Sequence, residues 1–311
     1  MEHYVTLFDS LFLPQGLALH RSLERHAKTY TLWILCVDEV SYDVLAKLNL
    51  PNIRLLQVNK LETPELLRVK PTRKKSEYCW TLTPFSIRFV FEADPSVLRV
   101  TYLDADVWFS KHPGPILEEF EASGKHVLIT DHDYAPEYDQ AVTSGRYCVQ
   151  FMTFTRGGGE VVRKWWEERC IEWCYARFED GKFGDQKYLD DWPERFPQQT
   201  HVLINNEFAM APWNAIVRHG SNEIFFHFHM LRISGNSTLN IGGYQLPRAV
   251  IDRLYKGYGA DLRASVDLLR SHNYLIKSQS KPLGFLKKTV RKGVNIYMFL
   301  KYGISNGTTT W

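Results

Sequence analysis

The sequence predicts an α/β fold in which a mostly parallel sheet is flanked by helices. Apolar, β-branched runs alternate with helix-like segments from residue 4 to residue 58, the pattern of strands joined by crossover helices. A further apolar run, residues 97–103, leads into two aspartates, at 104 and 106, as expected where a buried strand opens into a polar site. A chain of 311 residues is long enough for one large α/β core with an appendage.

Three strands and two helices are expected at the start of the chain. Residues 4–8, 30–37 and 53–58 are short apolar runs typical of buried strands. Residues 14–25 and 41–48 form the intervening helices, the first with a proline in its first turn. This is the beginning of a doubly wound sheet, in which ligands bind at the carboxyl ends of the strands.

The remaining elements continue the alternation. In chain order we expect a basic loop at residues 68–75, a helix at 81–91, strands at 127–130 and 151–155, a helix at 161–174, a loop entering a short helix at 182–192, a strand at 224–229 and a helix at 247–270. Two interpretations of the basic loop stay open: a solvated segment, and a segment that attracts a phosphate-bearing acceptor. The glycines at 157–159 lack the Lys-Ser/Thr of a phosphate-binding loop and are predicted to form only a turn.

Asp104 and Asp106 are the strongest indication of chemistry. Residues two apart on a strand point to the same side, so both carboxylates lie at the mouth of the preceding strand. They repel each other unless a cation lies between them, and oxygen ligands suit Mg²⁺ or Mn²⁺. His227 and His229 end a later apolar strand on a common side and are candidates to complete the site. The alternatives are a strand that ends in a polar turn, and histidines that belong to the core.

Composition favours a cytoplasmic protein. No run approaches the roughly 18 apolar residues of a membrane span. The first residues carry Glu2 and lead directly into a strand, unlike a secretory signal. The five cysteines form no CxxC pair, which is typical of reduced thiols.

The C-terminal segment is strongly basic. No Asp or Glu follows Asp267, whereas eight Lys and Arg do, interleaved with Leu, Ile, Phe and Tyr. Such a tail is typical of a segment that binds an anionic membrane surface, which would place the protein at the inner face of the cell membrane. The alternative is a solvated tail whose apolar residues pack on the main domain. No nucleic acid is expected, because no binding motif accompanies the charge.

Several motifs, taken in order, resemble those of metal-dependent, nucleotide-sugar glycosyltransferases. They are YVTLFD (4–9), GLALHRSLERH (16–26), YLDADV (102–107), FGDQKYLDDW (183–192), APWN (211–214) and FFHFH (225–229). The chain is most similar to glycosyltransferase family 8, the glycogenin-like and bacterial lipopolysaccharide sugar transferases. The resemblance implies a GT-A (Rossmann-like) domain over residues 1–245, followed by a helical extension with the basic tail over residues 246–311.

The resemblance also implies roles for individual residues. The metal would be bound by Asp106, Asp104 and His227, with His229 as the alternative to His227. Asp104 would also contact the ribose, while Thr6 and Asp9 would face the uracil and ribose. Arg88 would contact the donor sugar or phosphate, and Arg232 would contact the diphosphate. Asp185 would hydrogen-bond sugar hydroxyls, and Gln186 would lie beneath the anomeric carbon.

The sequence departs from the family pattern in three places. Tyr147-Cys148-Val149-Gln150 stands where the family has Asn-Ala-Gly, and Phe151 follows where small residues are usual. The family's His-x-x-Gly-x-x-Lys-Pro ending is missing after His229, which leaves Arg232 as the nearest cation. The resemblance is therefore that of a divergent member.

The function implied is transfer of a hexose from a nucleotide sugar, with UDP as the nucleotide, to a glycan or lipid-linked acceptor in cell-surface polysaccharide biosynthesis. The reaction would use Mn²⁺ or Mg²⁺ and retain the anomeric configuration; inversion would need a general base such as Asp131 or Asp133. Two other functions stay open. One is a haloacid-dehalogenase-like phosphatase with Asp104 as nucleophile, assisted by Lys187 and the Asp190-Asp191 pair. The other is a protein that binds a nucleotide sugar without turnover.

Overall fold

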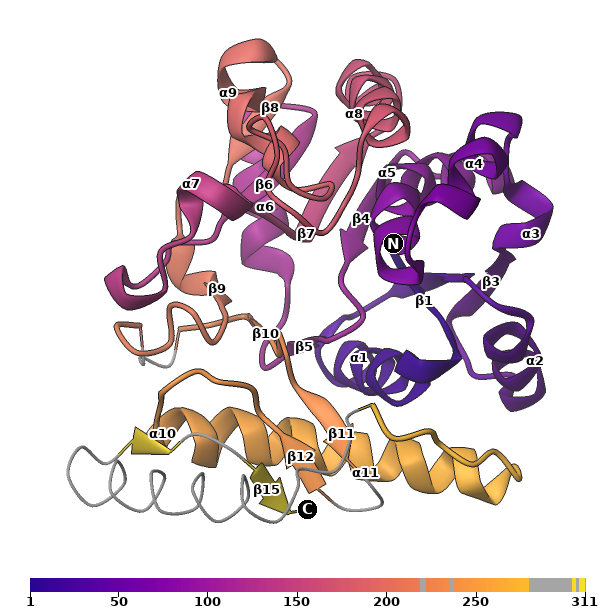
Figure 1. Cartoon of the computed structure of the whole chain (residues 1–311), viewed down its shortest axis with the longest axis vertical. Coiled ribbons are helices and arrows are strands. Elements are labelled where there is room, and N and C mark those ends of the chain that lie inside the picture. The colour runs from indigo at the N-terminus through magenta and orange to yellow at the C-terminus, as the bar shows by residue number, and fades with distance from the viewer. Residues whose placement is uncertain (219–221, 235–237, 280–303, 306–307, 311) are drawn as a thin grey trace.

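A seven-stranded sheet forms the centre of the molecule in a computed structural model that describes residues 1–218, 222–234, 238–279, 304–305 and 308–310 (Figure 1). The strand order is β3 (Ile53–Gln57), β2 (Tyr30–Cys36), β1 (Glu2–Phe8), β4 (Arg99–Leu103), β7 (Tyr147–Thr155), β6 (Val127–Asp131) and β8 (Thr200–Val202). β7 is antiparallel to β4 and to β6, and the other neighbours pair in parallel. The predicted mostly parallel α/β sheet is confirmed.

Helices cover both faces of this sheet. On one face lie α1 (Leu13–His26), α2 (Glu39–Leu48) and α6 (Gly114–Ser123), and on the other α4 (Pro64–Val69), α5 (Lys75–Ala93), α8 (Glu160–Glu172) and α9 (Trp192–Arg195). Side chains alternate between the two faces along β1. Tyr4 and Phe8 pack in the apolar core beneath α1, α2 and α6, whereas Val5 and Leu7 pack in the core beneath α4, α5, α8 and α9. Shorter helical turns connect these elements: η1 (Ser10–Phe12), α3 (Val58–Leu61), η2 (Lys70–Thr72), η3 (Pro136–Tyr138), α7 (Ala141–Ser144), η4 (Lys187–Asp191) and η5 (Asn206–Phe208).

A third apolar cluster joins the C-terminal segment to the main sheet. It lies around a small sheet of β5 (Val107–Phe109), β10 (Phe225–His227) and β9 (Ala209–Met210), and the helical run of α10 (Arg248–Val250), η6 (Ile251–Tyr255) and α11 (Lys256–Ser271) packs against it. Figure 1 shows α11 running beneath α1. The two helices are linked because Asp261 accepts hydrogen bonds from Arg25 and, at 2.6 Å, from the Trp108 indole nitrogen.

The last strands of the described chain are short. β11 (Arg232–Ser234) pairs with β12 (Thr238–Asn240), which pairs with β15 (Thr308–Thr310), and β13 (Leu246–Pro247) pairs with β14 (Ile304–Ser305). Most of the predicted basic tail, including Lys281, Lys287 and Lys288, lies outside the described residues. Among the residues that are described, no helix is long and apolar enough to cross a membrane.

The prediction of a basic loop at residues 68–75 is wrong. Thr63 caps α4, a 3₁₀ turn follows it, and α5 begins at Lys75, six residues before the predicted helix start at 81. Arg73 is buried within this segment and donates hydrogen bonds to the backbone oxygens of Cys170 (2.6 Å) and Ile171 (2.8 Å). The run of cations predicted a loop that is solvated or attracts a phosphate, whereas Arg73 instead binds the last carbonyls of α8.

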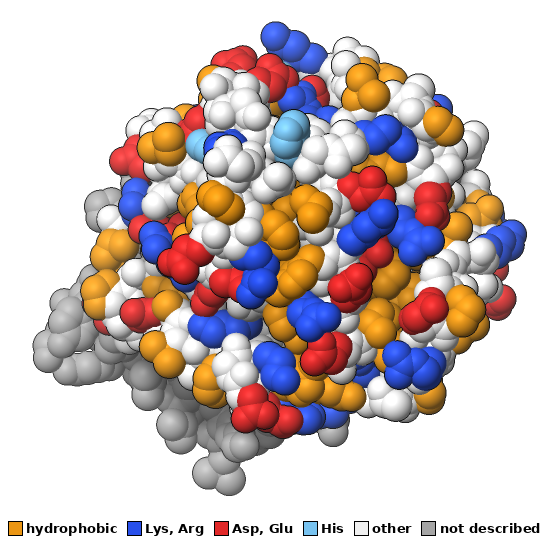
Figure 2. All heavy atoms as spheres, turned by 90° about the horizontal axis from the view of Figure 1, so that it is seen from above, with side chains coloured by type: hydrophobic (Ala, Val, Ile, Leu, Met, Phe, Trp, Pro, Cys, Tyr) orange, Lys and Arg blue, Asp and Glu red, His pale blue; other side chains and the backbone are white. Residues whose placement is uncertain are grey.

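Charges of both signs are interspersed on the surface. Figure 2 shows one face, seen from above the view of Figure 1, on which Lys and Arg side chains alternate with Asp and Glu. Pairs such as Arg169–Glu172 (2.7 Å) and Lys164–Glu160 (2.9 Å) connect neighbouring turns of α8. This face therefore carries no large patch of a single charge.

Candidate metal centre

The two aspartates lie on a tight connection between β4 and β5. The backbone nitrogen of Val107 donates to the Asp104 carbonyl (3.1 Å), which closes the turn. The backbone nitrogen of Asp104 donates to the Gln150 carbonyl on the neighbouring β7 (3.1 Å). Both carboxylates are therefore held at the edge of the sheet where the parallel strands β1 and β4 end.

β10 brings His227 to these carboxylates. It runs antiparallel to β5, with His227 opposite Val107, and the backbone nitrogen of Phe228 donates to the Asp106 carbonyl (2.9 Å). The His227 Nε2 atom lies 3.2 Å from Oδ1 of Asp106 and 3.7 Å from Oδ2 of Asp104. Ligand atoms of these three residues all lie within 4.8 Å of one another.

The pKa values of the cluster indicate that positive charge stabilises the two carboxylates. Burial raises the pKa of Asp104, against the opposing effect of His227. Burial also acts to raise the pKa of Asp106, but the charge and hydrogen bond of His227 outweigh it and lower this pKa to about 2. His227 in turn has a pKa well above its usual value, because Asp106 and Asp104 outweigh the effect of its own burial. Two carboxylates and an imidazole are also a suitable ligand set for Mn²⁺ or Mg²⁺.

His229 lies beside the cluster but outside the set of three. Its Nδ1 atom is 3.0 Å from the Tyr244 hydroxyl, and its ring packs against Trp213 at 5.4 Å between centroids. Burial, reinforced by the neighbouring His227, lowers the pKa of His229 to about 4. Of the two candidate histidines, the geometry favours His227.

Asp185 is buried within electrostatic reach of Asp104. Its backbone oxygen accepts a hydrogen bond from the Trp166 indole (2.8 Å), and the preceding Gly184 takes a left-handed conformation (φ +53°) against Trp80. Burial raises the pKa of Asp185 to about 7; a Thr83 hydrogen bond opposes this and the charge of Asp104 adds to it. Its Oδ2 atom has no hydrogen-bond partner among the described residues. The adjacent Gln186 donates to the Ser144 carbonyl (2.8 Å).

The other predicted residues at this edge of the sheet are Thr6 and Asp9. Thr6 is fully buried on β1, and its hydroxyl has no partner among the described residues. Asp9 caps η1 and pairs with Lys75 at the start of α5 (2.5 Å). Asp38, which follows β2, accepts from the Ser10 backbone (3.1 Å) and also contacts Lys75 (3.3 Å). Lys75 therefore bridges the ends of β1 and β2, a role that its place in a run of cations concealed.

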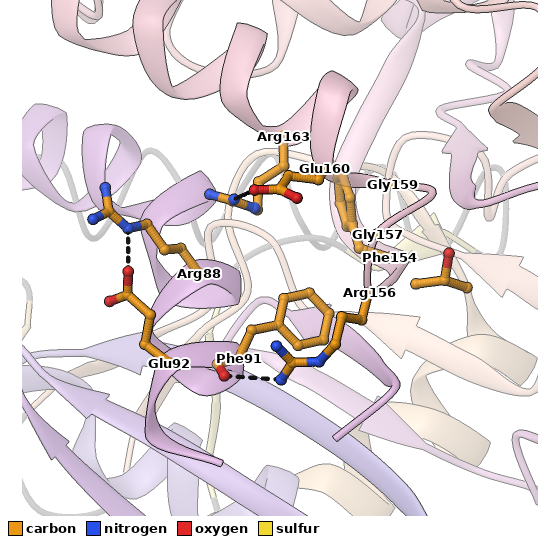
Figure 3. Close-up of a pocket in the computed structure, with 10 residues that line it drawn as sticks. Arg88, Phe91, Glu92, Phe154, Arg156, Gly157, Gly159, Glu160 and Arg163 are labelled. Carbon is orange, nitrogen blue, oxygen red and sulfur yellow. Dashed lines mark hydrogen bonds and ion pairs between the residues drawn. The ribbon is translucent and has the colours of Figure 1, made fainter. Parts of the chain in front are cut away.

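Arg88 is not brought to the cluster. It lies near the C-terminal end of α5, in a pocket with Glu92, Arg156 and Arg163 (Figure 3), and its Nε atom donates to Glu92 (2.7 Å). Phe154 and Thr155 also line this pocket and pair with the first residues of β4. Because α5 connects back to the start of β4, its last turns lie at the opposite edge of the sheet from Asp104.

Arg232 begins β11 near the carboxylates. Its guanidinium donates to the Leu231 carbonyl (2.7 Å) and lies over the Phe12 ring at 5.2 Å. Its charge contributes to the low pKa of Asp106 after the larger effects of burial and His227. The arrangement leaves this cation within electrostatic range of the cluster.

The side chains considered for other mechanisms are engaged elsewhere. Asp131 pairs with Arg146 (2.8 Å) and Asp133 with Arg218. Lys187 pairs with Asp190 (2.7 Å), and Asp191 with Arg195 (2.7 Å). None of these four ion pairs involves Asp104.

Gln150 is the site residue that sequence reasoning missed. Its side-chain oxygen lies 3.0 Å from Nδ1 of His227, and its side chain is 1% exposed. The available signal was the departure at residues 147–150 from the family's Asn-Ala-Gly motif, which places a glutamine in this strand.

Two proteins of Bacillus subtilis are similar in sequence to this chain. No protein-family model matches the chain. YfnF of Bacillus subtilis (strain 168), named an uncharacterized protein, is 34% identical over 249 residues, which cover 74% of this chain and 82% of YfnF. YfnD of the same organism, also uncharacterized, is 27% identical over 86% of this chain and 91% of its own length.

Two solved structures share the architecture. The galactosyltransferase LgtC, in complex with donor and acceptor sugar analogs, aligns with a TM-score of 0.50 and 15% identity over 92% of this chain and 99% of LgtC. The apo glycosyltransferase GlyE of Streptococcus pneumoniae TIGR4 aligns with a TM-score of 0.51 and 14% identity over 90% of this chain and 66% of GlyE.

The fold is thus GT-A-like, that of family 8 glycosyltransferases such as LgtC, and it carries a possible Asp-Asp-His metal site. The chain belongs to the same protein family as YfnF.

Proposed function

We propose that this protein is a metal-dependent glycosyltransferase that moves a hexose from a UDP-sugar to a glycan or lipid-linked acceptor. The observation that carries the proposal is the set of Asp104, Asp106 and His227, whose ligand atoms lie within 4.8 Å of one another at the edge of a GT-A-like sheet. LgtC, which shares the fold, is a galactosyltransferase whose structure holds donor and acceptor sugar analogs.

The reaction builds negative charge on the departing diphosphate and positive charge on the anomeric carbon. Asp104, Asp106 and His227 would hold Mn²⁺ or Mg²⁺, which when bound supplies Lewis-acid stabilisation of the leaving group. Arg232, whose charge already reaches Asp106, would add electrostatic stabilisation of the diphosphate.

Asp185 and Gln186 are proposed to face the donor sugar. Asp185 is buried, and its Oδ2 atom has no hydrogen-bond partner among the described residues. Such an oxygen suits a hydrogen bond from a sugar hydroxyl, because an unpaired buried polar atom is costly. We propose that the anomeric configuration is retained. The ion pairs of Asp131 and Asp133 with arginines argue against either one as the general base that inversion needs.

The nucleotide is proposed to lie where β1 and β2 end. Thr6, Asp9 and the bridging Lys75 present polar groups at that edge, which is the position where doubly wound sheets bind nucleotides. Arg88 receives no role in this proposal because it pairs with Glu92 in the pocket at the other edge.

The acceptor is proposed to be presented at the inner face of the cell membrane, with residues 1–245 carrying the reaction and the basic segment of residues 246–311 binding anionic lipid. The composition of the tail supports this. Flotation of the full chain with phosphatidylserine vesicles tests it. Replacement of Lys287, Lys288, Arg291 and Lys292 by Glu should abolish flotation, and equal flotation of both proteins would exclude the tail as the lipid-binding element.

Nucleoside diphosphate release tests the reaction itself. A panel of nucleotide sugars would be incubated with Mn²⁺ or with chelator, using wild type and Asp106→Ala. Release of UDP from one donor, lost with chelator and reduced at least about 100-fold by the substitution, is expected, since a metal contributes several kcal/mol. Phosphate release from an aryl phosphate would indicate a phosphatase instead. Thermal stabilisation by a UDP-sugar without any release would indicate a binding protein.

A further inference from the structure

The Gln150 side chain connects three strands at the metal centre. It belongs to β7, its amide nitrogen donates to the Thr130 hydroxyl on β6 (3.4 Å), and its amide oxygen lies 3.0 Å from Nδ1 of His227 on β10. Thr130, Gln150 and His227 are 0, 1 and 5% exposed. Solvent therefore competes little for these polar groups, and the Cys148 thiol is a further partner of the His227 ring within the protein.

The direction of this hydrogen-bond chain can be derived from its donors and acceptors. The Thr130 hydroxyl donates to the Cys148 carbonyl (3.4 Å), so its oxygen is left to accept from the Gln150 amide nitrogen. That contact turns the Gln150 amide oxygen toward His227. An amide oxygen only accepts, and Nδ1 of His227 must therefore carry the hydrogen.

We propose that Gln150 is a positioning residue that holds His227 with its proton on Nδ1 and its Nε2 lone pair free for a divalent cation. The inference rests on the metal centre of the proposed function. With the opposite amide orientation, Nδ1 would accept and the neutral ring would carry its hydrogen on Nε2, which would leave no lone pair there for a cation. Metal-ligating histidines owe their orientation to such an outer contact, whose loss typically lowers metal affinity by about 10–100-fold.

The backbone of the same residue supports the aspartates. The Gln150 carbonyl accepts from the backbone nitrogen of Asp104 (3.1 Å), a contact that no side-chain substitution removes. Substituting the Gln150 side chain therefore affects the orientation of His227 while the anchoring of Asp104 is retained. A substitution at position 150 therefore tests the role of the side chain alone.

The test measures Mn²⁺ affinity of the full chain by electron paramagnetic resonance of the free ion, with and without saturating UDP. Gln150→Met keeps the side-chain length but removes the acceptor, and should weaken Mn²⁺ binding by about 10–100-fold. Gln150→Glu retains an acceptor oxygen and should bind Mn²⁺ within about threefold of wild type. Gln15→Met is the matched control, because Gln15 is also fully buried but hydrogen-bonds Gln279.

A second variant and a second measurement guard against a folding defect. Thr130→Val removes the hydroxyl that orients the amide and should weaken Mn²⁺ binding by about threefold to tenfold, a smaller loss than in Gln150→Met. Nitrogen-15 histidine spectra of the Mg²⁺-loaded protein should show the His227 proton on Nδ1 in wild type, and a mixture of tautomers in Gln150→Met. A purely structural role for Gln150 would lower the unfolding temperature without changing either result.

The outcomes separate this inference from the function on which it rests. Wild-type Mn²⁺ affinity and an unchanged His227 tautomer in folded Gln150→Met would overturn the inference and leave the metal centre standing. If Gln150→Met does not fold, unchanged affinity and tautomer in Thr130→Val overturn it. If wild type itself binds no Mn²⁺, with or without UDP, the metal centre is wrong and the inference falls with it.

Discussion

The His227 Nε2 atom lies 3.2 Å from Oδ1 of Asp106, although the two residues belong to different strands far apart in the sequence. The contact exists because β10 adds to β5 in antiparallel register, with His227 opposite Val107. Without a metal, His227 supplies the positive charge that the two carboxylates need. A divalent cation would take over that role, and this exchange underlies the first prediction.

Mn²⁺ should stabilise the folded protein, and Asp106→Ala should remove the effect. At a Mn²⁺ concentration 100 times its Kd, ligand binding adds about 2.7 kcal/mol to the free energy of unfolding. Thermal unfolding with Mn²⁺ and with EDTA measures it. Lys164, which is exposed on α8 and pairs with Glu160, offers a control. Lys164→Ala should keep the full shift, whereas an undiminished shift in Asp106→Ala would contradict the assignment.

Asp185→Asn should abolish transfer and remove the loss of stability that ionisation of Asp185 causes in wild type as pH rises. The pKa of Asp185 is raised to about 7, so its stabilising contribution is complete below its unfolded pKa near 4 and is lost as pH rises through 7. The asparagine variant does not titrate. The free energy of unfolding of the variant, relative to wild type, should therefore increase by roughly 1–4 kcal/mol between pH 4 and 8.

Urea unfolding in EDTA at pH 4.5, 6 and 8 checks this prediction, with UDP release measured on the same preparations. A constant difference between the two proteins across this range would show that Asp185 ionises normally. Retention of full activity would remove Asp185 from the donor site.

His132→Asn should flatten the acid limb of the stability curve. Burial lowers the pKa of His132 to about 3, and its ring stacks on Tyr134 at 4.5 Å between centroids. A histidine held neutral in the folded state takes up a proton only on unfolding, so the free energy of unfolding falls as pH drops from about 6.5 toward 3. Asparagine can still donate to the Arg146 carbonyl, which His132 Nδ1 approaches at 3.1 Å.

The measurement is the free energy of unfolding from pH 3.5 to 7. Wild type should show a slope steeper than that of His132→Asn by up to about 1.4 kcal/mol per pH unit. Parallel curves for the two proteins would contradict the prediction, whatever the offset between them.

Arg73→Leu should destabilise the protein by about 2–4 kcal/mol, because it leaves the buried carbonyls of Cys170 and Ile171 without donors. Arg73→Lys should recover little of this loss, since one ammonium cannot reproduce the guanidinium fork. Chemical denaturation measures both. Arg68→Ala, on the exposed side of α4, should change stability by less than about 0.5 kcal/mol; equal effects at Arg68 and Arg73 would contradict the structural role of Arg73.

Local patterns in the sequence were sufficient for the elements and for part of the site. The strands at 30–37 and 53–58 could be predicted because each is a short apolar run. The structure has strands at Tyr30–Cys36, which is buried throughout, and at Ile53–Gln57, an edge strand in which only Leu56 is buried. Asp104 and Asp106 could be recognised because both belong to one short motif after one strand. The family motifs added the expected GT-A fold, which the architecture confirms.

Only the tertiary structure decided which residues of different segments are in contact. The sequence offered both His227 and His229, and the register of β10 against β5 brought His227 to the carboxylates while His229 lies against Tyr244. The direction of α5 carried Arg88 to the opposite edge of the sheet, and a missing family motif concealed the contact of Gln150 with His227. Periodicity and motif spacing depend on neighbours along the chain, whereas these contacts depend on strand order, register and helix direction, which are set by packing of the whole core.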